Sequence, residues 1–272
     1  MVKKLLKYEF TAMLRRMMPL CLIVLGTALL NRVIQFFERD NSTYQILFWS
    51  SVVLLFISCI VLILGTVWIS VNRYYRNLFT GEGYLTLSLP VTPDQHLFAK
   101  LFTAAVTVVI SGAVCVLAVM IITSGPMLVE LFKAGGYLYR MAAEEIGGGQ
   151  MFLYVLEMCL LTLLSICKGL LVLYACVSLG QLGRRNKNRP AKAVGIFFIY
   201  YFAVQLLTTA AMIVFAILSA NGMLSEILQW ISLHARQTAH LVAWGGILWA
   251  AAFGTLYYFI SRHVLKDRLN LE

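Results

Sequence analysis

Long apolar runs separated by short polar segments recur six times along the chain. A helix needs roughly 20 consecutive apolar residues to cross the hydrocarbon core of a bilayer. None of the runs alternates between apolar and polar residues at every second position, so we expect helices rather than strands. The predicted spans are about Met17–Phe37, Ile46–Val71, Phe98–Ser124, Met151–Leu182, Ala193–Ala220 and His240–Arg262.

The segment before the first span, residues 1–16, has the pattern of an amphipathic helix. Apolar residues recur every three or four positions, and polar residues fall roughly opposite them. Such a helix lies in the membrane interface, and a solvated basic tail is the alternative. Pro19 is expected to mark the elbow into the first span. The apolar face holds Leu6, Phe10, Met13 and Met17, and the polar face holds Lys4, Lys7, Thr11 and Arg15.

The second and third predicted helices extend beyond their apolar runs. The second is expected to continue past Val71 through the sequence NRYYRNLF. The third is predicted to begin at Pro93, because Thr92 is suited to cap it and Gln95 completes a capping box. Since about 32 residues of helix span about 48 Å, the third helix is expected to project beyond the ~30 Å hydrocarbon core on the cytoplasmic side.

Between these two helices lies the sequence GEGYLTLSLP, from Gly81 to Pro90. It is short and otherwise polar, yet it carries four large apolar side chains. Exposed apolar patches mark surfaces that contact a partner. We therefore expect a docking segment here, with its apolar side chains at Tyr84, Leu85, Leu87 and Leu89.

The remaining loops differ in kind. Residues 125–150 are predicted to form a longer outer loop whose glycine run is a mobile joint. Residues 221–239 are half apolar at helical spacing and too short to cross, so a re-entrant or interfacial helix is expected. In the last span Gly246, Ala250 and Gly254 recur at every fourth residue, a pattern that permits close helix packing within or between subunits.

Composition supports an integral membrane protein. The chain of 272 residues is 61% hydrophobic and 12% charged, with a mean hydropathy of +0.83. Soluble globular chains have about 25% charged residues, so this composition does not cover a soluble surface. No basic stripe is interleaved with exposed aromatic residues, which argues against nucleic-acid binding.

Lys and Arg residues gather at one end of the predicted helices. Sixteen of the 22 lie in the N-terminal segment, in the 72–100 and 183–192 loops, and at the C-terminus. Five lie at the opposite ends, and one, Lys168, lies inside a span. Because cytoplasmic loops are enriched in Lys and Arg, both termini are expected in the cytoplasm. The predicted location is the cell membrane.

The sequence carries little sign of catalytic chemistry. Charges inside spans are costly and often functional, yet Lys168 lies where a long side chain can reach the interface, so snorkelling is the alternative to a transport role. Glu157 and Arg32 are expected near the outer ends, facing water. No HExxH, GxSxG, GxxxxGK[ST] or CxxC sequence occurs, and the histidines form no metal set. We therefore expect no enzyme activity, metal or cofactor on this chain.

The layout resembles the permease subunits of ABC exporters, in the type-2 permease superfamily with the type V exporter fold. Two segments carry the specific part of the likeness. The sequence RNLFTGEGYLTLSLPVTPDQHLFAKL resembles the docking segment of small permeases of Gram-positive bacteria, and YYFISRHVLKDRLNLE resembles their ending. The resemblance implies an all-α, six-span fold with an interfacial elbow helix, and residues 1–272 as one permease domain.

The resemblance also implies partners and a mechanism. Two permease subunits, identical or different, pair around a pathway, and each sets its docking segment into an ABC ATPase subunit that holds the ATP and Mg²⁺. The implied ATPase contacts are Glu82, Gly83, Tyr84, Leu85, Leu87, Leu89 and Pro90. Substrate and direction of transport do not follow from the sequence. A secondary transporter driven by an ion gradient and a non-transporting membrane sensor or assembly protein are the alternatives.

Overall fold

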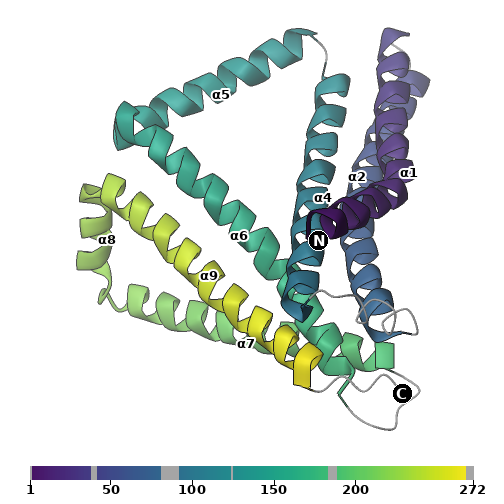
Figure 1. Cartoon of the computed structure of the whole chain (residues 1–272). Coiled ribbons are helices and arrows are strands. Elements are labelled where there is room, and N and C mark those ends of the chain that lie inside the picture. The colour runs from purple at the N-terminus through teal and green to yellow at the C-terminus, as the bar shows by residue number, and fades with distance from the viewer. Residues whose placement is uncertain (1, 38–41, 81–91, 124, 183–188, 268–272) are drawn as a thin grey trace. The chain divides into compact units, whose positions relative to one another are not determined.

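The computed structural model describes residues 2–37, 42–80, 92–123, 125–182 and 189–267. Every regular element in these ranges is an α-helix (Figure 1). Two compact units divide the chain, and the boundary falls inside one helix, between Gly136 and Tyr137. The helices are α1 (Val2–Phe36), α2 (Ser42–Phe79), α4 (Pro93–Ile122), α5 (Gly125–Ile146), α6 (Gly148–Gly180), α7 (Arg189–Ala220), α8 (Ser225–Leu233) and α9 (Ala235–Asp267).

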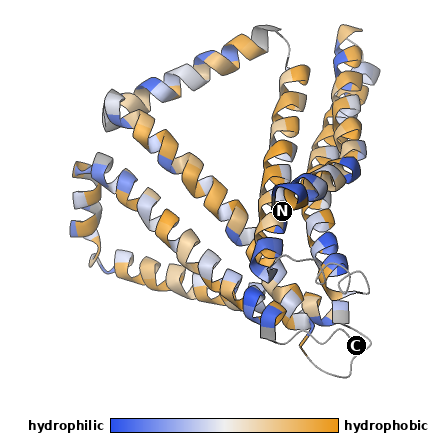
Figure 2. Ribbon diagram, viewed as in Figure 1, coloured by the Kyte–Doolittle hydropathy of each residue, from blue (hydrophilic) through white to orange (hydrophobic). Residues whose placement is uncertain are grey.

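Among the described residues, six helices are long and apolar enough to cross a membrane. They correspond to the six predicted spans, which confirms the all-α, six-helix part of the expected fold. Figure 2 shows apolar residues along most of α2 and α4, with polar residues gathered near the end of α2 and the start of α4. The long apolar segments are Lys3–Phe36, Ser42–Phe79, Pro93–Ile122, Gly149–Gly180, Pro190–Ala220 and Gln237–Lys266.

In the first unit α1, α2 and α4 pack against one another in all three pairings. A small apolar core holds them together, with Val24, Leu62 and Ala118 all fully buried. Gly65 of α2 shows how closely two of these helices approach. A Cβ atom added there would lie 2.8 Å from Leu20 Cδ1 of α1, so the absence of a side chain permits this contact.

In the second unit α6 packs against both α7 and α9, and α8 touches α9. Gly180 lies where α6 meets α7, since an added Cβ would stand 2.8 Å from both the Cβ and the backbone nitrogen of Ala193. The repeat of small residues in α9 also serves packing within the subunit. Gly246 faces Leu161 of α6, whose Cδ1 would be 3.0 Å from an added Cβ.

The N-terminal helix corrects one expectation. Residues 1–16 were expected to form a helix separate from the first span, but α1 is one helix that contains Pro19, the position of the expected elbow. Figure 1 shows that α1 changes direction along its length. A proline removes one backbone hydrogen bond and bends a helix without ending it when packing on both sides continues. Met13 and Met17 before the proline, and Cys21 after it, are all buried.

The structure of segment 125–150 also differs from the expectation. It was expected to be a loop with a mobile glycine joint, but α5 fills most of it and only Gly147 separates α5 from α6. Gly147 has φ of 92°, in the left-handed region that glycine enters without a steric penalty. One residue in this conformation is therefore enough to end α5 and start α6.

Other boundaries agree with expectation. α2 continues past Val71 to Phe79, and α4 begins at Pro93 with the capping box between Thr92 and Gln95 complete. A short helix, α8, lies within the 221–239 segment. One boundary differs: α9 starts at Ala235, five residues before the predicted span at His240, and its apolar segment begins at Gln237.

Candidate functional site

Three charged side chains from three helices meet inside the first unit. The Oε2 atom of Glu9, on α1, accepts a hydrogen bond from Arg73 Nε, on α2, at 2.5 Å. The other carboxylate oxygen, Oε1, accepts one from Lys100 Nζ, on α4, at 3.0 Å. We call these three residues the ion cluster. One carboxylate therefore joins all three helices of the unit through charge-assisted hydrogen bonds.

The ion cluster is buried, and burial determines how much it contributes to stability. Glu9 is 3% exposed, Arg73 5% and Lys100 4%. Ion pairs on a solvated surface contribute at most about 1 kcal/mol. Breaking a buried pair costs about 3–5 kcal/mol, because the charge that remains has neither water nor a partner. The ion cluster thus fixes where α1, α2 and α4 stand relative to one another at this level of the bundle.

Helical periodicity brings the three residues to the same interior. Arg73 follows the buried Ser70 of α2 by one turn, and Lys100 follows the buried His96 of α4 by one turn. Glu9 begins a buried stripe that repeats every three or four residues along α1. The stripe consists of Glu9, Met13, Met17, Cys21, Val24, Ala28 and Asn31.

Above the ion cluster, hydroxyl groups link α2 and α4. Ser111 of α4 donates a hydrogen bond to Thr66 of α2 at 3.2 Å, and both side chains are buried. Thr103 and Thr107 of α4 bond back to carbonyl oxygens of their own helix. Polar contacts between helices in lipid contribute roughly 0.6 kcal/mol each, so they supplement packing rather than replace it.

The predicted docking segment connects the two helices that supply the cations. Arg73 lies about two turns before the end of α2 at Phe79, and Lys100 about two turns after the start of α4 at Pro93. The docking residues themselves lie outside the described residues, so their roles stay predictions. These residues are Glu82, Gly83, Tyr84, Leu85, Leu87, Leu89 and Pro90.

The second unit contains a smaller polar cluster between α6 and α9. Glu157 Oε2 lies 2.8 Å from His240 Nδ1, and Glu157 Oε1 accepts a hydrogen bond from Trp244 Nε1 at 2.9 Å. The ring of Tyr154 meets the His240 ring edge-on, with centroids 5.9 Å apart. Both oxygens of the Glu157 carboxylate are thus bonded to the facing helix. Glu157 and His240 both lie in candidate spans.

Lys168, the predicted charge inside a span, lies on α6 and is partly exposed. It forms no ion pair with the parts of the chain that the structure describes. Neither snorkelling nor a transport role is tested by this placement, and both stay predictions.

The sequence pattern did not predict the ion cluster. Arg73 and Lys100 were interpreted only as cytoplasmic cations, and Glu9 was not singled out. One signal was present: Glu9 precedes Met13 and Met17 by four and eight residues, so it shares their face of the helix. A carboxylate on a buried helix face stays ionised only where a cation or hydrogen-bond donors meet it, so this position indicated a contact with another element.

Comparisons with known proteins found no match, so the class of this protein is argued from its helices. No family model, no curated protein and no solved structure matches the chain. Within the described ranges no group of three or more His, Cys, Asp or Glu side chains is arranged to hold a metal ion. Six candidate spans indicate a multi-pass membrane protein.

Proposed function

We propose that the chain is the permease subunit of an ABC exporter, working with a separate ATPase chain and a second permease subunit. The segment from Arg76 to Leu101 resembles the docking segment of such permeases, and it runs from the last turn of α2 to the start of α4, two helices that the ion cluster joins. The carrying observation is the bonding of Glu9 to both Arg73 and Lys100. This arrangement supports the proposal because a docking segment transmits force only if its two supporting helices move together.

In this mechanism the partner ATPase closes on ATP and displaces the docking segment. The displacement passes to α2 and α4 as a rigid pair and to α1 through Glu9. The spans then exchange one access state for another, as in other rigid-body transitions of bistable assemblies. The substrate class stays open, since the docking segment and the ion cluster carry no information about it.

The proposal is tested by purifying the full chain in mild detergent and identifying co-purified proteins by mass spectrometry. A chain with a Walker motif is expected with the unaltered protein and is expected to be lost from the Tyr84→Ala, Leu87→Ala double variant. A matched control removes one Tyr and one Leu from exposed positions on α5, Tyr137→Ala and Leu138→Ala, and should retain the ATPase. Retention in both variants, or no ATPase with the unaltered chain, would contradict the proposal.

One observation favours a second candidate function, an ion-driven secondary transporter. Glu157 and His240 form a carboxylate–imidazole pair inside candidate spans, and such residues often carry protons in transporters. In vesicles that contain only this chain, an imposed pH gradient would then drive proton flux that Glu157→Gln abolishes. The ABC permease predicts no such flux in the absence of its ATPase.

A further inference from the structure

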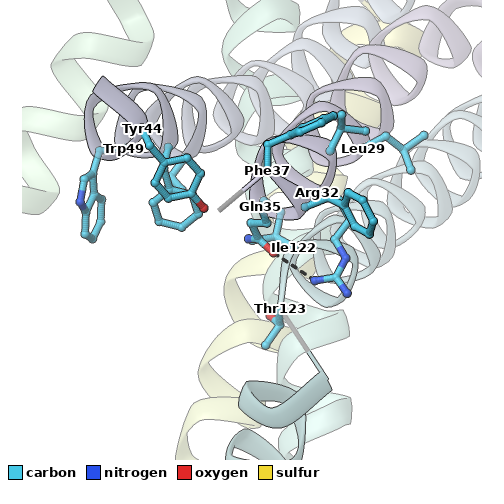
Figure 3. A pocket seen from close by; sticks show the side chains of 12 residues that line it. Leu29, Arg32, Gln35, Phe37, Tyr44, Trp49, Ile122 and Thr123 are labelled. Carbon is cyan, nitrogen blue, oxygen red and sulfur yellow. Dashed lines mark hydrogen bonds between the residues drawn. The ribbon is translucent and has the colours of Figure 1, made fainter. Parts of the chain in front are cut away.

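A pocket of about 990 Å³ opens at one end of the first unit, between the end of α1, the start of α2 and the end of α4. It lies apart from the ion cluster, since Glu9 is near the opposite end of α1. Figure 3 shows side chains from all three helices around it. Arg32 lies on α1 and Phe37 directly follows α1, Tyr44 and Trp49 lie on α2, and Thr123 lies at the end of α4.

The pocket combines an aromatic wall with a single cation. Aromatic rings supply much of its lining, and three pairs of them are in ring contact: Phe36 with Phe37, Tyr44 with Phe48, and Phe48 with Trp49. Arg32 is the only charged side chain in the lining that the structure describes. The aromatic residues are Phe36, Phe37, Tyr44, Phe48 and Trp49.

A chain of hydrogen bonds holds Arg32 at the pocket. Arg32 Nη1 donates to Gln35 Oε1 at 3.0 Å, the bond drawn in Figure 3. Gln35 Nε2 in turn donates to Asn31 Oδ1 at 3.5 Å, and Asn31 Nδ2 donates to Ser51 Oγ of α2 at 2.9 Å. Asn31 is fully buried, so this chain is anchored in the bundle. Among the described residues only one of the five N–H donors of this guanidinium is bonded, so the others can meet an anion.

The place of Arg32 in the membrane argues for a bound anion. The asymmetry of Lys and Arg puts this end of the helices outside, where cations are in the minority. A cation retained there, among aromatic rings at the end of three apolar helices, matches the phosphate level of a bilayer, where Trp and Tyr gather. Arginine is well suited to phosphate because it binds two oxygens at once.

We propose that this pocket binds an anionic phospholipid, with the phosphate at Arg32 and the acyl chains along the aromatic wall. The volume and the mixed lining suit a molecule that is charged at one end and apolar at the other. Phospholipid is the anionic amphiphile that surrounds a membrane-spanning bundle at this depth. The proposal needs only the membrane-spanning helices and is independent of any ATPase partner.

Tryptophan quenching by brominated lipid tests it on the full chain. The protein is reconstituted in phosphatidylcholine vesicles in which a growing share of lipid is brominated phosphatidylglycerol or brominated phosphatidylcholine. The quenching that belongs to Trp49 is the difference between the unaltered chain and Trp49→Phe. We expect the anionic lipid to half-quench Trp49 at about a fivefold lower share, as one Arg near anionic lipid predicts.

Arg32→Gln should remove this preference, and Arg32→Lys should keep most of it, since the charge remains. The matched control is Trp249, an exposed residue of α9, whose quenching should not depend on the lipid charge. Equal half-quenching shares for the two lipids at Trp49 would overturn the proposal, as would a preference that survives Arg32→Gln.

Discussion

Glu9 is the only acidic residue before Glu38 in a basic N-terminal segment, and both of its oxygens are bonded to cations of other helices. At the residue scale this makes it the link between α1 and the two helices that flank the predicted docking segment. A second carboxylate, Glu157, also joins two helices, α6 and α9, with one bond to each of its oxygens. The two differ in burial of their partners, because Trp244 is half exposed whereas Arg73 and Lys100 are buried.

We expect replacement of Glu9 to lower the stability of the protein. Glu9→Gln removes the buried carboxylate that bonds both Arg73 and Lys100, so we expect the free energy of unfolding to fall by about 3–5 kcal/mol. Thermal unfolding of the purified chain in detergent measures this loss. Lys7→Gln, an exposed change on the same helix, is the control and should shift stability by no more than about 0.5 kcal/mol. A loss no larger than the control's would mean that the ion cluster does not hold the bundle together.

We expect the contacts of Glu157 to contribute less to stability than those of Glu9. Trp244→Phe removes one hydrogen bond to Glu157 while keeping an aromatic ring, and we expect a loss of about 0.6 kcal/mol. The same unfolding assay compares it with Trp68→Phe, at a position that is 69% exposed. Equal values for the two variants would show that the Trp244 bond adds nothing to the packing of α6 on α9.

Helix boundaries show which features of an element the sequence reveals. The start of α4 was predictable because Thr92, Pro93 and Gln95 act locally, within one turn. The continuity of α1 was not, since a proline can either bend or end a helix and only tertiary contacts decide whether the helix continues. α5 was missed because its glycine residues and charges resemble a loop. Helix starts set by local capping can thus be predicted from a sequence, whereas the effect of tertiary packing on a weak helix cannot.

Helix contact through Gly180 gives a prediction with an internal control. In Gly180→Ala the new Cβ would collide with the backbone of Ala193 on α7, and we expect a loss of about 1–3 kcal/mol in the free energy of unfolding. Gly169→Ala lies on the same helix with nothing within 4 Å, so it should raise stability by up to about 1 kcal/mol. Changes of the same sign in the unfolding assay would contradict the close approach of α6 and α7.

At the scale of the whole molecule, six apolar helices follow from the sequence because lipid requires every backbone group to be paired within its own segment. The ion cluster does not follow, because it joins residues 64 and 91 positions apart. What the sequence does indicate is direction: cations at one end, and the patterned segment from Gly81 to Pro90 at that same end. The proposed coupling of this segment to an ATPase is the central claim.

Photo-cross-linking in living cells tests that claim most directly. A photoreactive amino acid at position 87, in the docking segment, is compared with one at position 47, an exposed leucine near the start of α2. The permease mechanism predicts an adduct between position 87 and a Walker-motif ATPase, and none from position 47. No ATPase adduct from position 87, or from positions 84, 85 and 89 probed in the same way, would contradict it.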